Sequence, residues 1–270
     1  MKTRILAAVV GIPLLFIIVL VMPKIVAALV FAAMLAIGAY EMLYRTGLVR
    51  QGRLVIYSCV MAFVVTLWSY YGAVHAYFLL IMLAFCMLLF AEMMIDHIHI
   101  HFETICMCFV GGFAVPYLLS ALVRILILGI GRYVVLIPFA VAFLSDAGAY
   151  FAGMRFGKHK LAPVVSPNKT IEGVLGGLVS AVAGMLVYAF ILDVPLKFEV
   201  NYGLAILYGL VGSGAGVFGD LCFSIIKRQT GIKDYGNLIP GHGGILDRFD
   251  SMMTVAPLME ALLLIAPLAV

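Results

Sequence analysis

Charged side chains are scarce in this chain. Only 17 Lys and Arg and 13 Asp and Glu occur among 270 residues, 11% of the sequence, whereas hydrophobic residues make up 65%. An ordinary soluble domain is about 25% charged and 45–50% apolar. The composition therefore excludes water-soluble globular and disordered proteins. The small formal net charge of +4 gives no indication of a nucleic-acid partner and is compatible with anionic lipids.

Several common motifs are also missing. The five cysteines are odd in number and lie in or beside apolar runs without C-x-x-C or zinc-ligand spacing. That distribution favours small buried side chains over a disulfide framework. The sequence contains neither a Walker A loop nor a dinucleotide-binding fingerprint. The function must therefore be sought in the apolar runs and in the few polar clusters between them.

Long apolar runs make up most of the sequence, and nine of them approach the roughly 20 residues that cross a hydrocarbon core. Because the runs are continuous and do not alternate with polar residues, we predict an all-α polytopic integral membrane protein and exclude a β-barrel. The first run is too long for the apolar part of a signal peptide, so we expect a retained helix. The predicted helices are Ile5–Met22, Ile25–Tyr44, Leu54–Val74, Ala76–Ile95, Ile105–Val123, Tyr133–Gly153, Ile171–Leu192, Tyr202–Lys227 and Asp247–Leu268.

The distribution of basic residues predicts the topology. With nine helices, 13 of the 17 Lys and Arg residues fall on the side of the N-terminus and 4 on the other side. The positive-inside rule makes the first side cytoplasmic, so we expect a protein of the cell or inner membrane with its N-terminus inside and its C-terminus outside. We predict that residues 1–140 form structural, lipid-facing helices. Residues 141–270 are predicted to carry a catalytic site at the cytoplasmic edge.

The densest polar cluster begins on the predicted helix 202–227. Asp220, Ser224 and Lys227 recur at i, i+4 and i+7, which places them on one helical stripe, and Arg228 follows directly. A turn-rich loop with Lys233 comes next. Cations on one stripe beside a carboxylate suit an anionic ligand.

The second half of this cluster is Gly241–Asp250. Glycines on both sides of His242 permit unusual backbone dihedrals and close approach of N–H groups to a ligand. Asp247 and Asp250 follow at i, i+3, on one face of a first helical turn. Carboxylates beside several cations are the groups needed to hold a divalent metal together with a phosphate.

A smaller cluster lies around Asp146, inside an apolar run. An ionised carboxylate at the centre of a spanning helix costs about 2.5–3.5 kcal/mol on insertion scales, so Asp146 is expected to face a water-filled cavity or a cation. A neutral Asp146 hydrogen-bonded between helices is the alternative. The segment Ser166–Thr170 precedes a helix, where N–H groups and Lys169 suit a phosphate; a plain capping turn is the other interpretation.

These residues resemble the signature of the phosphatidate cytidylyltransferase (CDP-diacylglycerol synthase) family. Its pattern S-x-x-K-R, four residues, K-D, then H-G-G-x-x-D-R-x-D is complete over Ser224–Asp250, and S-D-x-x-A-Y and S-P-x-K-T-x-E-G occur at Ser145–Tyr150 and Ser166–Gly173. The pattern departs at Phe223, where the family commonly has a glutamate.

The resemblance implies a nucleotidyltransferase of phospholipid biosynthesis. Its members transfer a cytidylyl group from CTP to phosphatidic acid, giving CDP-diacylglycerol and pyrophosphate, with Mg²⁺ as cofactor. Whether a second cation binds, and whether the enzyme is a homodimer, stay open. The expected catalytic residues are Asp146, Asp220, Asp247 and Asp250, with Asp220 and Asp247 as principal metal ligands and Asp146 as a further one. The expected substrate-binding residues are Ser166, Asn168, Lys169, Lys227, Arg228, Lys233, His242 and Arg248.

Two other functions remain open. Another CTP-dependent lipid enzyme, such as a lipid kinase, needs a similar set of residues. An ion-coupled transporter would use Asp146 and Asp220 as coupling sites within the membrane. The dense loop of Lys, Arg, His and Asp at one membrane edge favours an enzyme. For an enzyme, we expect the acyl chains of the lipid to enter sideways from the bilayer among the C-terminal helices.

Overall fold

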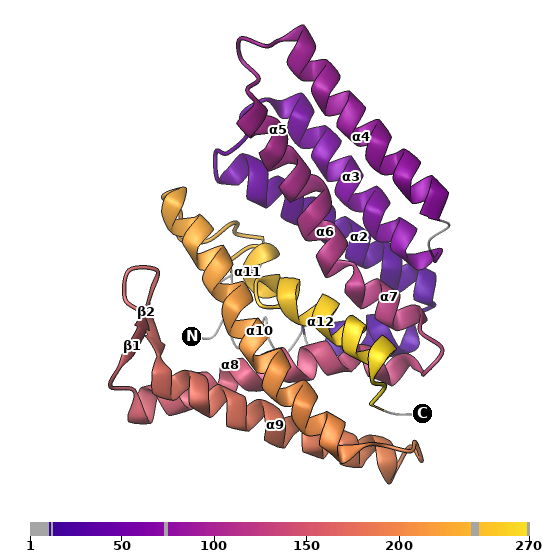
Figure 1. Ribbon diagram of the computed structural model, residues 1–270, viewed down its shortest axis with the longest axis vertical. Coiled ribbons are helices and arrows are strands. Elements are labelled where there is room, and N and C mark those ends of the chain that lie inside the picture. Colours follow the sequence, from indigo (N-terminus) through magenta and orange to yellow (C-terminus); the bar gives the residue numbers. More distant parts are fainter. Residues whose placement is uncertain (1–10, 12, 73–74, 239–242, 269–270) are drawn as a thin grey trace. The chain divides into compact units, whose positions relative to one another are not determined.

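The computed structural model describes residue 11 and residues 13–72, 75–238 and 243–268. These residues are mostly helical, because helices satisfy every backbone hydrogen bond within one segment in lipid (Figure 1). The elements are η1 (Ile17–Val21), α2 (Lys24–Tyr40), η2 (Glu41–Arg45), α3 (Gly52–Tyr70), α4 (His75–Ile95), α5 (Phe102–Phe109), η3 (Val110–Ala114), α6 (Val115–Leu119), α7 (Ala121–Ile127), η4 (Arg132–Val135), α8 (Leu136–Phe156), β1 (Lys160–Ala162), β2 (Ser166–Thr170), α9 (Ile171–Asp193), α10 (Tyr202–Gln229), α11 (Leu246–Phe249) and α12 (Met252–Ile265).

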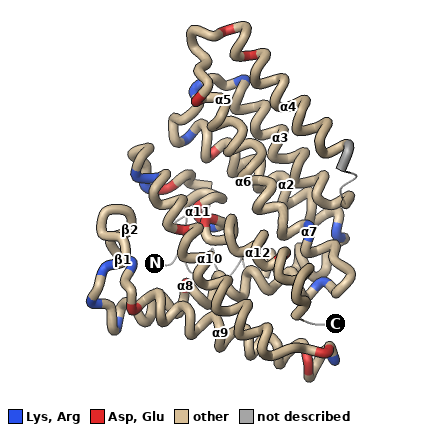
Figure 2. Tube along the Cα trace, in the orientation of Figure 1, with Lys and Arg blue, Asp and Glu red and all other residues tan. Residues whose placement is uncertain are grey.

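Within the described residues, seven helical segments are long and apolar enough to cross a membrane. They are Lys24–Arg45, Gly52–Tyr70, Tyr77–Ile95, Phe102–Ile127, Arg132–Phe156, Ile171–Asp193 and Tyr202–Gln229. Figure 2 shows long stretches of helix without a charged residue, as in α9, whose charges are at its two ends. The prediction of a helical membrane protein is confirmed.

The predicted number of nine helices is not confirmed. Residues 5–10 and 12 of the predicted helix Ile5–Met22 lie outside the described residues, so its full length is not tested, whereas residues 13–21 are helical and end in η1. The predicted last helix, Asp247–Leu268, is broken by a turn at Asp250 and Ser251 into α11 and α12. With 14 residues, α12 rises only about 21 Å, which is less than the ~30 Å thickness of a hydrocarbon core.

A small sheet was not predicted. β1 and β2 form an antiparallel hairpin between α8 and α9, with Lys160 opposite Thr170. The Glu172 carboxylate at the start of α9 accepts the backbone N–H of Lys158 at 3.1 Å and contacts Nδ1 of His159 at 2.6 Å. Thr170 caps α9 by accepting the N–H of Gly173, so a capping turn, the other interpretation of Ser166–Thr170, is present.

The described chain divides into two compact units. The first comprises Met1–Ile127 and Gln229–Phe249, and the second comprises Leu128–Arg228 and Asp250–Val270. The division falls inside the signature segment Ser224–Asp250. Each unit therefore contains part of the residues selected from the sequence.

The first unit has its apolar core among α3, α4 and α5 and the segments beside them. Leu43, Leu54, Leu89 and Ile105 are among its fully or almost fully buried members. α2 packs along α3. The core thus fixes α2 and the short π-helical segment η2, on which the buried Glu41 lies.

The second unit is built on close packing of α8 against α9 (Figure 1). Small side chains allow this approach: a Cβ atom added to Gly148 would overlap Ser180, and one added to Gly176 would overlap Ala152. A hydrogen bond of 2.7 Å between the buried hydroxyls of Ser145 and Ser213 joins α8 to α10. The hydroxyl of Thr254 on α12 donates to the carbonyl of Ala215 on α10 at 2.6 Å.

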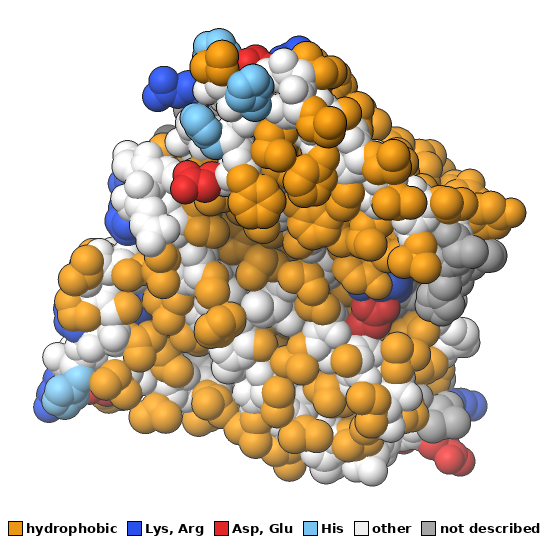
Figure 3. Space-filling view, turned by 45° about the horizontal axis from the view of Figure 1, so that its top comes forward, with side chains coloured by type: hydrophobic (Ala, Val, Ile, Leu, Met, Phe, Trp, Pro, Cys, Tyr) orange, Lys and Arg blue, Asp and Glu red, His pale blue; other side chains and the backbone are white. Residues whose placement is uncertain are grey.

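Large apolar side chains cover the outside of both units. The face drawn in Figure 3 is dominated by hydrophobic side chains. Exposed residues such as Phe151, Leu175 and Val179 would be unfavourable in water but are normal against lipid.

Candidate active site

Three of the four aspartates predicted to be catalytic belong to the second unit. Asp146 is exposed on α8, Asp220 lies near the end of α10, and Asp250 lies in the turn before α12. Burial raises the pKa of the Asp250 carboxyl to about 7, and the nearby carboxylates of Asp220 and Asp146 add to this increase. The carboxylates of Asp146 and Asp220 therefore lie close enough to Asp250 to disfavour its ionisation, and the three are called the acidic cluster below.

Two lysines are the cations of this cluster. The Nζ of Lys169 on β2 lies 2.5 Å from Oδ2 of Asp220, and the Nζ of Lys227 lies 3.9 Å from Oδ2 of Asp250. The hydroxyl of Ser224 donates to Oδ1 of Asp220 at 3.2 Å. The predicted stripe of Asp220, Ser224 and Lys227 on α10 is therefore present. The hairpin places a second basic residue, Lys169, beside this stripe.

The remaining selected residues of this unit flank the cluster. The guanidinium of Arg228 donates through Nε to the carbonyl of Val165 at 3.1 Å, which holds the end of α10 against the hairpin. Ser166 is half-buried on β2, and Asn168 is exposed on it. Phe223, at the position where the resembling family has a glutamate, is fully buried and belongs to the packing of α10.

The first unit contains Asp247, which is also buried. Its Oδ2 atom accepts the backbone N–H of Tyr235 at 2.8 Å and that of Gly244 at 2.9 Å. Gly243 has φ of 85°, and a Cβ atom there would lie 2.7 Å from the same oxygen. Asp247 thus organises the backbone of the signature loop and explains a glycine at 243.

Of the predicted substrate-binding residues in this loop, Lys233 and Arg248 are exposed and accessible to solvent or a ligand. His242 lies outside the described residues. A residue not selected from the sequence also contacts this loop: the carboxylate of Glu41 on η2 accepts the backbone N–H of Leu246 at 3.0 Å. A single acidic residue within the apolar run Lys24–Tyr44 was the signal that could have identified it.

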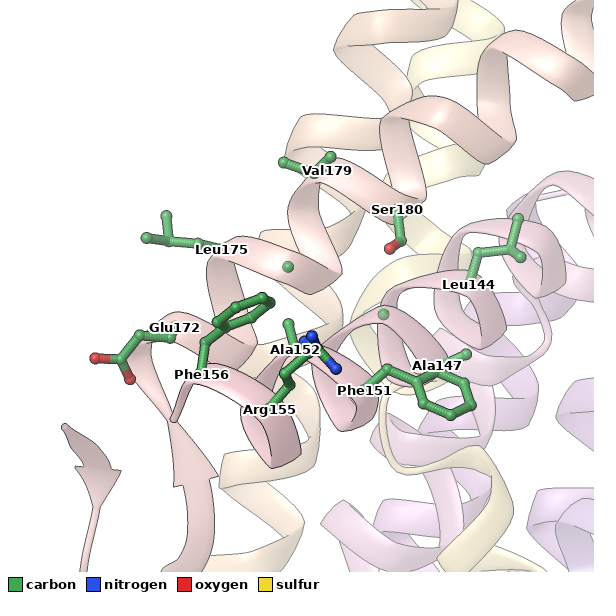
Figure 4. Close-up of a pocket in the computed structure, with 12 residues that line it drawn as sticks. Leu144, Ala147, Phe151, Ala152, Arg155, Phe156, Glu172, Leu175, Val179 and Ser180 are labelled. Atoms are coloured by element: carbon green, nitrogen blue, oxygen red, sulfur yellow. The ribbon is translucent and has the colours of Figure 1, made fainter. Parts of the chain in front are cut away.

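An apolar groove lies elsewhere in the second unit, between α8 and α9 (Figure 4). It has a volume of about 730 Å³ and is lined mainly by apolar side chains such as Phe151 and Leu175, with Arg155 and Glu172 also lining it. By helical spacing its α8 residues lie roughly opposite Asp146. The groove is therefore not the place where the acidic cluster would act.

Among the described residues, no three His, Cys, Asp or Glu side chains form a group that could hold a metal ion by themselves. Mg²⁺ does not require such a group, since it commonly takes one or two carboxylates together with waters and substrate phosphates. Asp220 and Asp250 are hard oxygen donors whose mutual repulsion a cation would relieve. The donor set fits Mg²⁺.

Comparison with known proteins agrees with this chemistry. The sequence profile described as "Cytidylyltransferase family" matches residues 2–266. Proteins named phosphatidate cytidylyltransferase from Staphylococcus haemolyticus, Staphylococcus saprophyticus and Staphylococcus aureus are 48%, 46% and 45% identical over 134 residues. Each match covers 50% of this chain and 50% of the relative, so the chain aligns with about half the length of these curated relatives. Because the family profile covers nearly the whole chain, the chain belongs to the cytidylyltransferase family.

Proposed function

We propose that this protein transfers the cytidylyl group of CTP to phosphatidic acid, forming CDP-diacylglycerol and pyrophosphate. The observation that carries the proposal is the cluster of Asp146, Asp220 and Asp250 with Lys169 and Lys227 in a chain that otherwise has few charges. The family membership and the names of the relatives support this choice of substrates.

The reaction is a displacement at phosphorus. An ionised phosphate oxygen of phosphatidate attacks the α-phosphorus of CTP, and a new P–O bond forms between them. The bond from the α-phosphorus to the oxygen that bridges to the β-phosphate breaks, and pyrophosphate leaves with that electron pair. An already ionised nucleophile needs no strong general base, so the task of the protein is to align two polyanions and to neutralise their charge.

The basic residues are assigned to the phosphates. Lys169 and Lys227 are held at the acidic cluster and can exchange a carboxylate for a phosphate oxygen as the substrate binds. Arg228, Lys233 and Arg248 supply further positive charge. Ser166, Asn168 and His242 are assigned as polar contacts to the phosphates or the lipid head group.

We assign Mg²⁺ to the carboxylates of Asp220 and Asp250, with Asp146 as a further ligand or orienting group. Bound there, Mg²⁺ would neutralise phosphate charge and make pyrophosphate a better leaving group. Without the cation, the lysines neutralise the carboxylates of the cluster. Substrate binding would therefore move the ammonium groups of Lys169 and Lys227 from the carboxylates to the phosphates.

The topology supports a site at the cytoplasmic edge. Two candidate spans, Ile171–Asp193 and Tyr202–Gln229, separate the hairpin from the signature loop, so both emerge on the same side of the membrane. The segment 46–51 is separated from the hairpin by four candidate spans and falls on that side too. Most of the basic residues lie on this side, which we assign as cytoplasmic.

A lipid kinase and an ion-coupled carrier are the competing functions. The kinase would transfer the γ-phosphate of CTP, and the carrier would move ions or solutes without changing CTP. Neither function includes transfer of a cytidylyl group, the reaction for which the family is named. The profile match over residues 2–266 therefore disfavours both.

The test is reconstitution of the purified protein in vesicles with phosphatidate, CTP and Mg²⁺, followed by mass spectrometry of the lipids. We expect a CDP-diacylglycerol product that disappears when either substrate or Mg²⁺ is omitted. Well-folded protein that makes no CDP-lipid would contradict the proposal. Solute flux across the same vesicles without any CTP-dependent product would select the carrier.

A further inference from the structure

Glu41 is a buried acidic residue to which the proposed reaction assigns no role. Its side chain is 3% exposed, and it begins the π-helical segment η2 (Glu41–Arg45) directly after α2. Burying a carboxylate is unfavourable unless hydrogen bonds compensate it. A π-helical turn within an α-helix is a strained feature that often occurs at functional positions. The contacts of Glu41 therefore need an explanation.

Those contacts are made to the signature loop, 205 residues away in sequence. Oε2 of Glu41 accepts the backbone N–H of Leu246 at 3.0 Å. Leu246 begins α11, so this carboxylate lies at the first turn of the short helix that carries Asp247 and Arg248. The contact therefore joins the end of α2 to the start of the segment that carries these two side chains.

Glycines of the loop fit closely around the same carboxylate. A Cβ atom added to Gly236 or to Gly244 would overlap Oε1 of Glu41. Gly244 also donates its N–H to Asp247 at 2.9 Å, so its backbone lies between two buried carboxylates. Glu41 and Asp247 together hold the loop from two sides and explain why small residues are required at 236 and 244.

We propose that Glu41 is a positioning residue that fixes the loop carrying Lys233, Asp247 and Arg248 in the conformation that acts on CTP. The contribution to turnover rests on the proposed function. The contribution to loop conformation does not, and it can be measured without any substrate. Glu41 acts through the backbone of the loop and is not itself assigned to contact CTP or the lipid.

The first experiment compares Glu41→Gln with wild-type protein by hydrogen–deuterium exchange in the same vesicles. The substitution keeps the shape of the side chain and weakens its hydrogen bond to Leu246. We expect exchange in peptides covering 243–249 to become about tenfold faster, with α3 and α4 unchanged. Unchanged exchange in 243–249 would overturn the proposal. Glu103→Gln makes the same chemical change at an exposed residue of α5 in the same unit and is expected to alter neither segment.

The second measurement is turnover. For Glu41→Gln we expect kcat to fall by about 10- to 100-fold, the range found for groups that orient catalytic ligands, with an unchanged KM for phosphatidate. A purely structural role would instead lower the thermal midpoint and the amount of active protein while leaving kcat per active molecule unchanged. That outcome, or full activity, would contradict the proposal. If wild-type protein makes no CDP-lipid, the proposed function fails, and the exchange data still decide the role of Glu41.

A third experiment uses two other substitutions, so that the proposal can still be tested if Glu41→Gln fails to fold. Gly244→Ala is expected to disturb the loop because its methyl group would overlap Glu41. Combining it with Glu41→Ala removes that overlap, so the two changes together should accelerate exchange in 243–249 less than the sum of their separate effects predicts. Strictly additive effects would show that Gly244 and Glu41 do not interact and would overturn the proposal.

Discussion

Lys169 on the hairpin and Asp220 on α10 form an ion pair, with Nζ 2.5 Å from Oδ2. Both side chains are about one-quarter exposed, so the pair is accessible to a ligand. The pair joins two sequence segments that were each selected for phosphate chemistry. It is the contact through which the proposed site can change from a resting arrangement to one that holds CTP.

Removal of Lys169 tests whether the hairpin serves the reaction. We expect Lys169→Ala to lower kcat by about 10²–10³-fold, as for the loss of one group that stabilises developing charge. The matched control is Lys158→Ala, because Lys158 is exposed in the same connection and contacts Glu172 only through its backbone N–H. CDP-lipid formation by equal amounts of folded protein measures both. Similar rates for the two variants would remove Lys169 from the site.

Asp220 is expected to determine the response to Mg²⁺. Asp220→Asn should lower turnover by about 10²-fold or more at any Mg²⁺ concentration, or shift the half-maximal concentration strongly upward, because a hard anionic donor is replaced by a neutral one. Activity across a Mg²⁺ titration is the measurement. Asp193→Asn, at the far end of α9 beside Tyr202, is the control and should follow the wild-type curve. A wild-type Mg²⁺ curve for Asp220→Asn would contradict the assignment.

The raised pKa of Asp250 predicts that the stability of the protein depends on pH in buffer without added Mg²⁺. Burial, followed by the Asp220 carboxylate, raises the pKa of Asp250 to about 7, whereas its value in the unfolded chain is about 3.8. The folded protein therefore binds the extra proton between these values, and its stability falls as pH rises from about 4 to 7 and then levels off.

Asp250→Asn keeps this side chain neutral at every pH and removes that loss. We expect the variant to unfold a few degrees Celsius above wild type at pH 8 and at about the same temperature as wild type at pH 4. Thermal unfolding of both proteins across this range is the measurement. A difference in midpoint that does not change with pH would show that Asp250 does not titrate in this window.

The packing of α8 on α9 predicts a strong asymmetry between two glycines. Gly176→Val places a branched side chain against Ala152, and overpacking of this kind costs about 1–3 kcal/mol. Gly214→Ala on α10 meets no atom within 4 Å and should be neutral or stabilising by up to about 1 kcal/mol. Thermal midpoints in one detergent compare the two. Equal midpoints would mean that α8 and α9 pack less closely than described.

Features set by neighbouring residues could be predicted from the sequence. The stripe of Asp220, Ser224 and Lys227 depends only on helical spacing, and the cap at Thr170 depends on a hydroxyl placed before an apolar run. Both are present. The helical membrane character follows from the length of the apolar runs, which the bilayer requires.

Features set by contacts between distant residues could not be predicted. The bond between Glu41 and Leu246 joins positions 205 residues apart, and nothing in either segment specifies the other. The sequence predicts Asp247 as a metal ligand, but it does not show that the Oδ2 atom of this residue accepts two backbone N–H groups of its own loop. The hairpin is too short, and too rich in turn residues, to show the alternation of a strand.

The measurement that tests the central claim most directly is the fate of two labels in CTP. Purified protein is incubated with phosphatidate, Mg²⁺ and CTP carrying radioactive phosphorus at either the α or the γ position. The account predicts that the α label enters the lipid and that the γ label is released as pyrophosphate. Transfer of the γ label to the lipid, or no label in the lipid from either position, would contradict it.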